Sequence, residues 1–198
     1  MSIDERPISN PLPFVRGWLR DPVGVGLPFP SSGATARRLA RAAFDAAIPR
    51  AGPVLELGAG TGAVTEALIE CRCPADRIVA VERDVELCRA LERRFPGSQI
   101  LQGDALEVGT VLRNAGLSSV CVVVSGLPMR AIPSNAAGRC YSGAFEAMPP
   151  DGAIIQYTYG LRPPVDPRVT RPALEATFVG REWRNFPPMG IWRYRLSG

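Results

Sequence analysis

Short apolar runs alternate with helix-like segments between residues 54 and 158, and this alternation constrains the fold most. The run CVVV at 121–124 is apolar throughout, which is typical of a strand buried on both faces of a parallel sheet. The predicted strands are Val54–Leu57, Ile78–Val81, Ile100–Gln102, Val120–Ser125 and Ile154–Thr158, and the predicted helices are Ala34–Ile48, Ala63–Cys71, Val85–Phe95, Val108–Ala115 and Ser134–Ala147. We therefore expect an α/β fold with right-handed crossovers and a doubly wound, mostly parallel sheet.

The two ends of the chain depart from this alternation. Thr177–Trp183 and Ile191–Arg195 are strand-like and are joined by the turn-rich sequence NFPPMG, which predicts an antiparallel hairpin at the sheet edge. These strands bring the predicted sheet to seven. Residues 1–33 contain six prolines and are predicted to form a separate N-terminal segment, followed by one domain over 34–198.

Composition excludes several kinds of site. The 198 residues include no His, and all 23 basic residues are Arg. Metal sites that need imidazole are therefore excluded, and proton transfer falls to carboxylates, tyrosines, backbone groups or water. The five cysteines form no CxxC pair, which favours reduced thiols in a cytoplasmic protein. No apolar run approaches the roughly 18 residues of a spanning helix.

The positive charge is concentrated at the two ends. The net charge is +4, with seven Arg against four acids in residues 1–50 and seven against three in residues 161–198. Such a distribution suits nucleic acid, anionic lipid or an acidic substrate.

The sequence VLELGAGTG at 54–62 follows a predicted strand and opens a predicted helix. Gly58, Gly60 and Ala63 also satisfy the dinucleotide fingerprint, so the glycines alone do not identify the ligand. Glu56 at the end of the strand would repel a pyrophosphate, whereas it suits the cationic amino group and sulfonium of S-adenosylmethionine. The loop therefore favours S-adenosylmethionine over NAD.

Two further acids end the next two predicted strands. Glu82 stands where a carboxylate accepts hydrogen bonds from ribose hydroxyls, and Asp104 can recognise an adenine edge. Three acids at three consecutive strand ends are expected to converge on one crevice. The alternative is that each acid is a solvated strand end or a helix cap.

Residues 54–128, with VLELGAGTG, VAVERD and QGDA in order, resemble the core of class I methyltransferases, which have a seven-stranded, Rossmann-like sheet. The resemblance implies S-adenosylmethionine as cofactor and S-adenosylhomocysteine as product. It places the cofactor contacts at Ser31, Ser32, Glu56, Leu57, Gly58, Gly60, Thr61, Glu82, Arg83, Gly103, Asp104, Ala105 and Ser125.

The flanking motifs PSS at 30–32, VSGLP at 124–128, QYTYG at 156–160, WRNFPP at 183–188 and IWRY at 191–194 are similar to those of bacterial phospholipid N-methyltransferases. That family converts phosphatidylethanolamine to phosphatidylcholine on the cytoplasmic membrane face. The resemblance implies a peripheral, monomeric enzyme that docks through an amphipathic N-terminal helix. Phe14 and Trp18 are four residues apart and flanked by Arg16 and Arg20, which is typical of an interfacial anchor. The alternative is a helix packed on the core.

The acceptor is expected near the end of the fourth strand, at SGLP. With no His available, a tyrosine hydroxyl or a backbone carbonyl near Ser125, Gly126 and Leu127 would orient the amine while water takes its proton, and Tyr157 and Tyr141 are favoured for the substrate. The expected aromatic walls around a cationic headgroup are Tyr141, Tyr157, Tyr159, Trp183 and Trp192, and the expected phosphate ligands are Arg181, Arg184 and Arg193.

Three rival functions stay open. Methyltransferases of base amines resemble SGLP but carry an aromatic residue where this chain has Met129, which counts against an RNA adenine N6-dimethyltransferase and against nucleic acid as partner. A non-catalytic nucleoside-binding module is a second rival. A dehydrogenase is disfavoured by Glu56.

Overall fold

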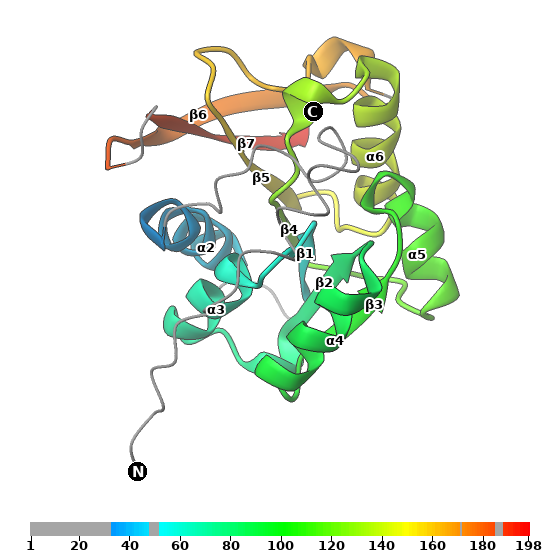
Figure 1. Cartoon of the computed structure of the whole chain (residues 1–198). Helices are drawn as coiled ribbons and strands as arrows, with labels where there is room; N and C mark the ends of the chain where they lie inside the picture. The colour runs from blue at the N-terminus through cyan, green and yellow to red at the C-terminus, as the bar shows by residue number, and fades with distance from the viewer. Residues whose placement is uncertain (1–32, 48–51, 171, 185–187) are drawn as a thin grey trace.

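The computed structural model describes residues 33–47, 52–170, 172–184 and 188–198. Seven strands form one sheet in the order β3-β2-β1-β4-β5-β7-β6, and β7 alone runs antiparallel to its neighbours (Figure 1). The strands are β1 (Val54–Leu57), β2 (Ile78–Glu82), β3 (Gln99–Gln102), β4 (Val122–Ser125), β5 (Ala153–Thr158), β6 (Leu174–Glu182) and β7 (Met189–Leu196). The predicted fold class and the terminal hairpin are confirmed.

Helices cover both faces of the sheet. The α-helices are α2 (Gly33–Ala47), α3 (Ala63–Glu70), α4 (Val85–Arg94), α5 (Val108–Asn114) and α6 (Ser134–Glu146), and the short 3-10 turns are η1 (Ala75–Arg77), η2 (Ala105–Glu107), η3 (Met129–Ala131) and η4 (Pro167–Val169). α2, α3 and α4 pack on one face, while α5 and α6 pack on the other. Successive strand residues point to opposite faces, so Leu55 and Leu57 enter the core under α5 and α6, whereas Val54 faces α2 and α3.

Within the described ranges each strand and helix predicted between residues 34 and 195 is present, with ends shifted by three residues at most. The largest shift is at β6, which begins at Leu174 rather than Thr177 because its pairing with β7 starts at Leu196. α4 begins where Asp84 Oδ1 accepts hydrogen bonds from the backbone amides of Glu86 (2.8 Å) and Leu87 (3.0 Å).

No helix within the described ranges is long and apolar enough to cross a membrane. The predicted N-terminal docking helix, with Phe14, Arg16, Trp18 and Arg20, lies outside the described residues, as do Ser31 and Ser32.

Candidate cofactor site and acceptor loop

The glycine loop turns from β1 into α3 through residues with left-handed backbone. Gly58 and Gly60 have φ angles of 71° and 56°, a region that side chains with a Cβ atom rarely adopt. A Cβ atom on Gly58 would lie 2.6 Å from Leu127 Cδ2, whereas one on Gly60 would have no heavy atom within 4 Å among the described residues. Gly58 therefore permits close contact with the loop after β4, and Gly60 faces space that a ligand can enter.

Glu82 fixes this loop from the neighbouring strand. Its Oε2 accepts a hydrogen bond from the Gly60 amide (2.8 Å), and its Oε1 accepts from the amides of Arg83 (2.8 Å) and Asp84 (2.9 Å). A carboxylate has about four acceptor positions, so at least one stays available for a ribose hydroxyl. The carboxylate thus shapes the glycine loop and faces the same ligand space.

Asp104 lies two residues beyond β3, whose last residue, Gln102, is paired with Glu82. Its Oδ1 accepts from the Leu106 amide (2.9 Å) and caps η2. The side chain is exposed. The sequence alone left open that Asp104 is a helix cap, and this cap is present. The capping hydrogen bond keeps the carboxylate at the carboxyl edge of the sheet, so it does not exclude contact with a ligand there.

Glu56 differs from the expected rim acid. It is 1% exposed and its Oε2 accepts a hydrogen bond from Thr65 Oγ1 of α3 at 2.6 Å. Burial raises the pKa of Glu56 from 4.5 to about 8, the Thr65 hydrogen bond opposes this shift, and the nearby Glu82 charge adds to it. The predicted rim therefore carries two carboxylates, and the third is buried against α3, where burial favours its protonated form.

The other predicted cofactor residues take different positions. Thr61 and Gly103 are half-buried at the loop and after β3, and Arg83 is exposed beside Glu82. Leu57, Ala105 and Ser125 have buried side chains, so only their backbone can face a ligand.

The loop after β4 is held by a chain of hydrogen bonds that begins on α6. The Tyr141 hydroxyl donates to Gln156 Oε1 (3.1 Å), and Gln156 Nε2 donates to the carbonyls of Leu127 and Tyr157 (both 2.9 Å). The Leu127 carbonyl also accepts from the Met129 amide (2.9 Å), so its two acceptor positions are filled. Tyr141 is 0% exposed. Tyr141 and the Leu127 carbonyl therefore position the loop, and the substrate role predicted for Tyr141 would require its buried hydroxyl to be uncovered.

Two predicted acceptor groups stay accessible. Tyr157 is half-buried and its hydroxyl donates to the Gly126 carbonyl at 3.2 Å, and no second donor to that carbonyl is found among the described residues. Gln156 was missed by sequence reasoning, although a fully buried Gln within the apolar strand β5 is a signal that it has polar partners.

The expected aromatic enclosure is dispersed. Trp183 is 73% exposed beyond the end of β6, Tyr141 is buried against Tyr194, and Trp192 packs on Phe178. Tyr157 and Tyr159 are in edge-to-face contact at 6.1 Å between ring centroids. Of the five predicted aromatic walls, only Tyr157 and Tyr159 lie at the end of β5, the first within the strand and the second directly after it.

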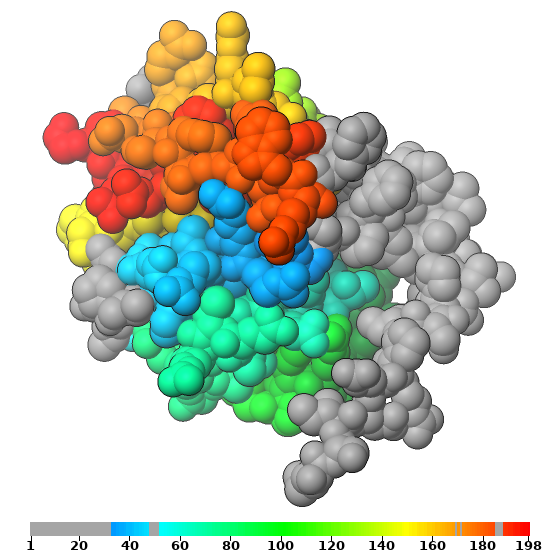
Figure 2. Space-filling model, turned by 90° about the vertical axis from the view of Figure 1, so that its left-hand side faces the viewer, coloured from blue at the N-terminus to red at the C-terminus, as the bar shows by residue number. Residues whose placement is uncertain are grey.

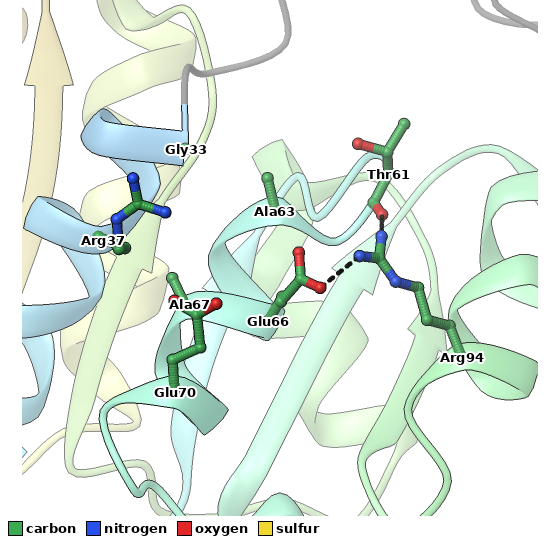
Figure 3. A pocket seen from close by; sticks show the side chains of 8 residues that line it. All are labelled: Gly33, Arg37, Thr61, Ala63, Glu66, Ala67, Glu70 and Arg94. Carbon is green, nitrogen blue, oxygen red and sulfur yellow. Dashed lines mark hydrogen bonds and ion pairs between the residues drawn. The ribbon is translucent and has the colours of Figure 1, made fainter. Parts of the chain in front are cut away.

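A cavity of about 250 Å³ lies on the outer side of the glycine loop (Figure 3). Arg94 lines one side of this cavity, where it forms an ion pair with Glu66 (2.7 Å) and donates a hydrogen bond to the Thr61 carbonyl (2.9 Å). Its lining comes from Gly33, Arg37, Thr61, Ala63, Glu66, Ala67, Glu70 and Arg94. Because it includes neither Glu82 nor Asp104, this cavity is distinct from the crevice at the strand ends.

Known proteins are similar to this chain in sequence and in fold. No family model matches the chain. Ornithine lipid N-methyltransferase of Singulisphaera acidiphila is 33% identical over 143 residues, covering 70% of this chain and 73% of that protein. The probable ribosomal RNA small subunit methyltransferase A of Halobacterium salinarum is 36% identical over 91 residues, which cover 42% of this chain and 31% of that protein.

Solved structures agree on the architecture. The CcbJ methyltransferase of Streptomyces caelestis matches 85% of this chain and 97% of its own at a TM-score of 0.60 and 16% identity. The glycopeptide N-methyltransferase MtfA, complexed with sinefungin, matches 85% of this chain and 95% of its own at a TM-score of 0.59 and 14% identity. At these identities the likeness establishes the fold.

The residues of this chain fit S-adenosylmethionine as the cofactor. Among the described residues Gly60 borders open space, Glu82 and Asp104 can accept hydrogen bonds from hydroxyl and amino donors, and Glu56 is a buried acid that would be negative once ionised. By its architecture and by its identity to a curated relative over most of both chains, the protein is a class I S-adenosylmethionine-dependent methyltransferase and belongs to the family that includes ornithine lipid N-methyltransferase.

Proposed function

We propose that the chain methylates the primary amine of a membrane lipid headgroup, with phosphatidylethanolamine as the first candidate and its mono- and dimethyl forms as successive substrates. Ornithine lipid is the second candidate, because the relative that matches most of this chain bears that acceptor in its name. The observation that carries the proposal is the acceptor loop, where Gly126 and Tyr157 present neutral oxygen acceptors rather than a base.

These two groups suit an amine. When bound, S-adenosylmethionine supplies an activated methyl group. A primary amine has a pKa of about 10 and must lose a proton before it attacks. The Gly126 carbonyl and the Tyr157 hydroxyl oxygen can each accept an N–H and so aim the nitrogen lone pair. Burial raises the pKa of Tyr157, so its hydroxyl keeps its proton and orients the amine, while water removes the proton.

Arg130 offers recognition of the anionic group that both candidate headgroups carry near the amine. It lies in η3, directly after SGLP, and its Nη1 is 3.0 Å from the position that a Cβ atom on Gly160 would occupy. Arg130 therefore bridges the loops after β4 and β5. Within the described ranges no carboxylate pairs with its guanidinium, so the guanidinium is available for a lipid phosphate or the ornithine carboxylate.

The buried side chain of Met129 weighs against RNA methylation. It occupies the position expected for an aromatic platform in base-amine methyltransferases and is 2% exposed, so it offers no surface for stacking a flipped base. The matches to ribosomal RNA small subunit methyltransferase A also cover only 30–36% of those proteins' own length.

The deciding experiment is methyl transfer from labelled S-adenosylmethionine to vesicles that contain phosphatidylethanolamine, its methylated forms or ornithine lipid, with adenine-containing RNA as comparison. We expect lipid methylation, and Arg130→Ala should raise KM about tenfold, as expected for loss of a charged hydrogen bond. Arg89→Ala, an exposed Arg of α4, is the matched control. Methylation of RNA without lipid would contradict the proposal.

A further inference from the structure

The outer end of β6 carries a concentration of exposed apolar side chains. Phe178 is 47% exposed, Val179 44% and Trp183 73%, and they lie within six residues of one another. Only three other large hydrophobic side chains in the described ranges are exposed, and they are scattered: Ile69, Val85 and Leu161. A single exposed apolar residue is ordinary, whereas a group on one edge indicates a contact surface.

Arg181 joins the two aromatic rings of this group. Its guanidinium carbon is 5.9 Å from the Phe178 ring centroid and 5.6 Å from that of Trp183. The neighbouring acid points to the other face of the sheet, because Glu182 pairs with Arg38 of α2 at 3.9 Å. Phe178, Val179, Arg181 and Trp183 thus form a cationic and aromatic surface, here called the hairpin patch.

The hairpin patch lies at the same edge of the sheet as the acceptor loop. Gly190 of β7 is paired with Thr158 at the end of β5 and with Arg181 of β6, so Trp183 stands just beyond the carboxyl end of β5. Three strand spacings separate β4 from β6, a lateral distance of about 14 Å. In Figure 2 the left-hand side of Figure 1 faces the viewer, and the orange surface of β6 lies in front, above the blue surface of α2.

We propose that the hairpin patch contacts the interface of an anionic bilayer and orients the carboxyl edge of the sheet toward the lipid headgroups. The inference rests on the proposed lipid methylation. Trp and Phe favour the headgroup boundary, and Arg meets anionic lipid there. A second copy of the chain is a poorer occupant, because the edge strand is bulged between Phe178 and Gly180 and carries Glu175, Arg181 and Glu182, features that oppose strand pairing.

The test is sedimentation of the full chain with vesicles of phosphatidylcholine alone or with phosphatidylglycerol. Phe178→Ala with Trp183→Ala should weaken binding to the anionic vesicles about tenfold through lost interfacial apolar area. Arg181→Ala should weaken it about fivefold and reduce its salt sensitivity. Ile69→Ala on α3 is the matched apolar control and should bind as the unchanged chain does.

Two readouts separate this inference from the proposed function. The variant with Phe178→Ala and Trp183→Ala should keep cofactor affinity and the methylation of a short-chain, water-soluble phosphatidylethanolamine, while methylation on vesicles falls. Unchanged vesicle binding would overturn the inference and leave lipid methylation standing. Patch-dependent binding without lipid methylation by the unchanged chain would overturn the proposed function instead. A patch-dependent dimer in size-exclusion chromatography, with unchanged sedimentation, would identify a second copy as the occupant.

Discussion

The two halves of the sheet build their functional surfaces in different ways. In the half formed by β3, β2, β1 and β4, the residues predicted to bind the cofactor lie in short local motifs at the strand ends, such as the glycine loop and the turns that begin with Glu82 and Asp104. At the border with the half formed by β5, β7 and β6, the acceptor loop after β4 is fixed by side chains from distant segments, with Tyr141 of α6 acting through Gln156 of β5 on Leu127. Cofactor binding should therefore respond to changes within motifs, and acceptor turnover to changes far from them.

Glu82 gives the largest expected effect. Glu82→Ala removes the acceptor for the Gly60 amide and the carboxylate expected to bind the ribose, so cofactor affinity should fall about 100-fold, as expected for two charge-assisted hydrogen bonds. Isothermal titration calorimetry with S-adenosylhomocysteine measures this. Glu86→Ala, an exposed acid in the first turn of α4, is the matched control. Equal affinity in both variants would remove Glu82 from the site.

Glu56→Gln should separate stability from cofactor binding. The variant keeps the shape of the side chain but cannot become negative, so affinity for the cationic cofactor should fall about tenfold, equivalent to roughly 1.4 kcal/mol. Calorimetry of the two proteins gives this ratio. An unchanged affinity at pH 8 would exclude Glu56 as the counter-charge.

The same variant should change the pH dependence of the ligand-free protein. The pKa of Glu56 is raised from 4.5 to about 8 in the folded protein. Between these two pH values the unfolded chain binds fewer protons than the folded protein, so the stability of the fold decreases as the pH rises. Glu56→Gln should lose that part of the slope and be the more stable protein at pH 8. Denaturant unfolding at pH 5 and pH 8 is the measurement, and equal slopes would contradict the raised pKa.

Tyr141→Phe tests whether acceptor turnover depends on a hydrogen bond made far from the acceptor loop. Removing the hydroxyl leaves Gln156 Oε1 without this partner, so kcat should fall about fivefold and stability by about 1 kcal/mol, with cofactor affinity unchanged. Tyr194→Phe is the control, because its hydroxyl bonds the Val165 amide (3.0 Å) and carbonyl (3.1 Å) instead. A similar loss of stability with full kcat is expected there, and equal kcat losses would show that Tyr141 acts through packing alone.

Arg94→Ala should give the smallest effect. Its ion pair with Glu66 lies at the surface, where such pairs contribute about 0.2–1 kcal/mol. Cofactor affinity should change less than twofold, because the cavity that Arg94 lines is separate from the crevice at the strand ends. A tenfold loss in titration would move the cofactor site to that cavity.

Periodicity and the glycine loop were sufficient to predict the sheet, since local patterns determine each strand and helix. They also located Glu82 and Asp104, because parallel strands end at one edge. Burial of Glu56 and of Tyr141 depends on α3 and β5 packing against them, and such contacts between distant segments leave no local signature. The exposure of Trp183 was missed for the same reason, since pairing between β6 and β7 decides which side chains remain uncovered.

The contact between Gly58 and Leu127 has a consequence for altering this enzyme. The glycine loop and the acceptor loop are in direct contact through the Leu127 side chain, and the Gly126 amide donates a hydrogen bond to the Leu57 carbonyl at 2.8 Å. A bulkier residue at position 127, chosen to narrow the range of acceptors, would press first on the loop that receives the methyl donor. The range of acceptors is therefore better redesigned from β5, where a new side chain can change the surroundings of the acceptor loop without displacing the glycine loop.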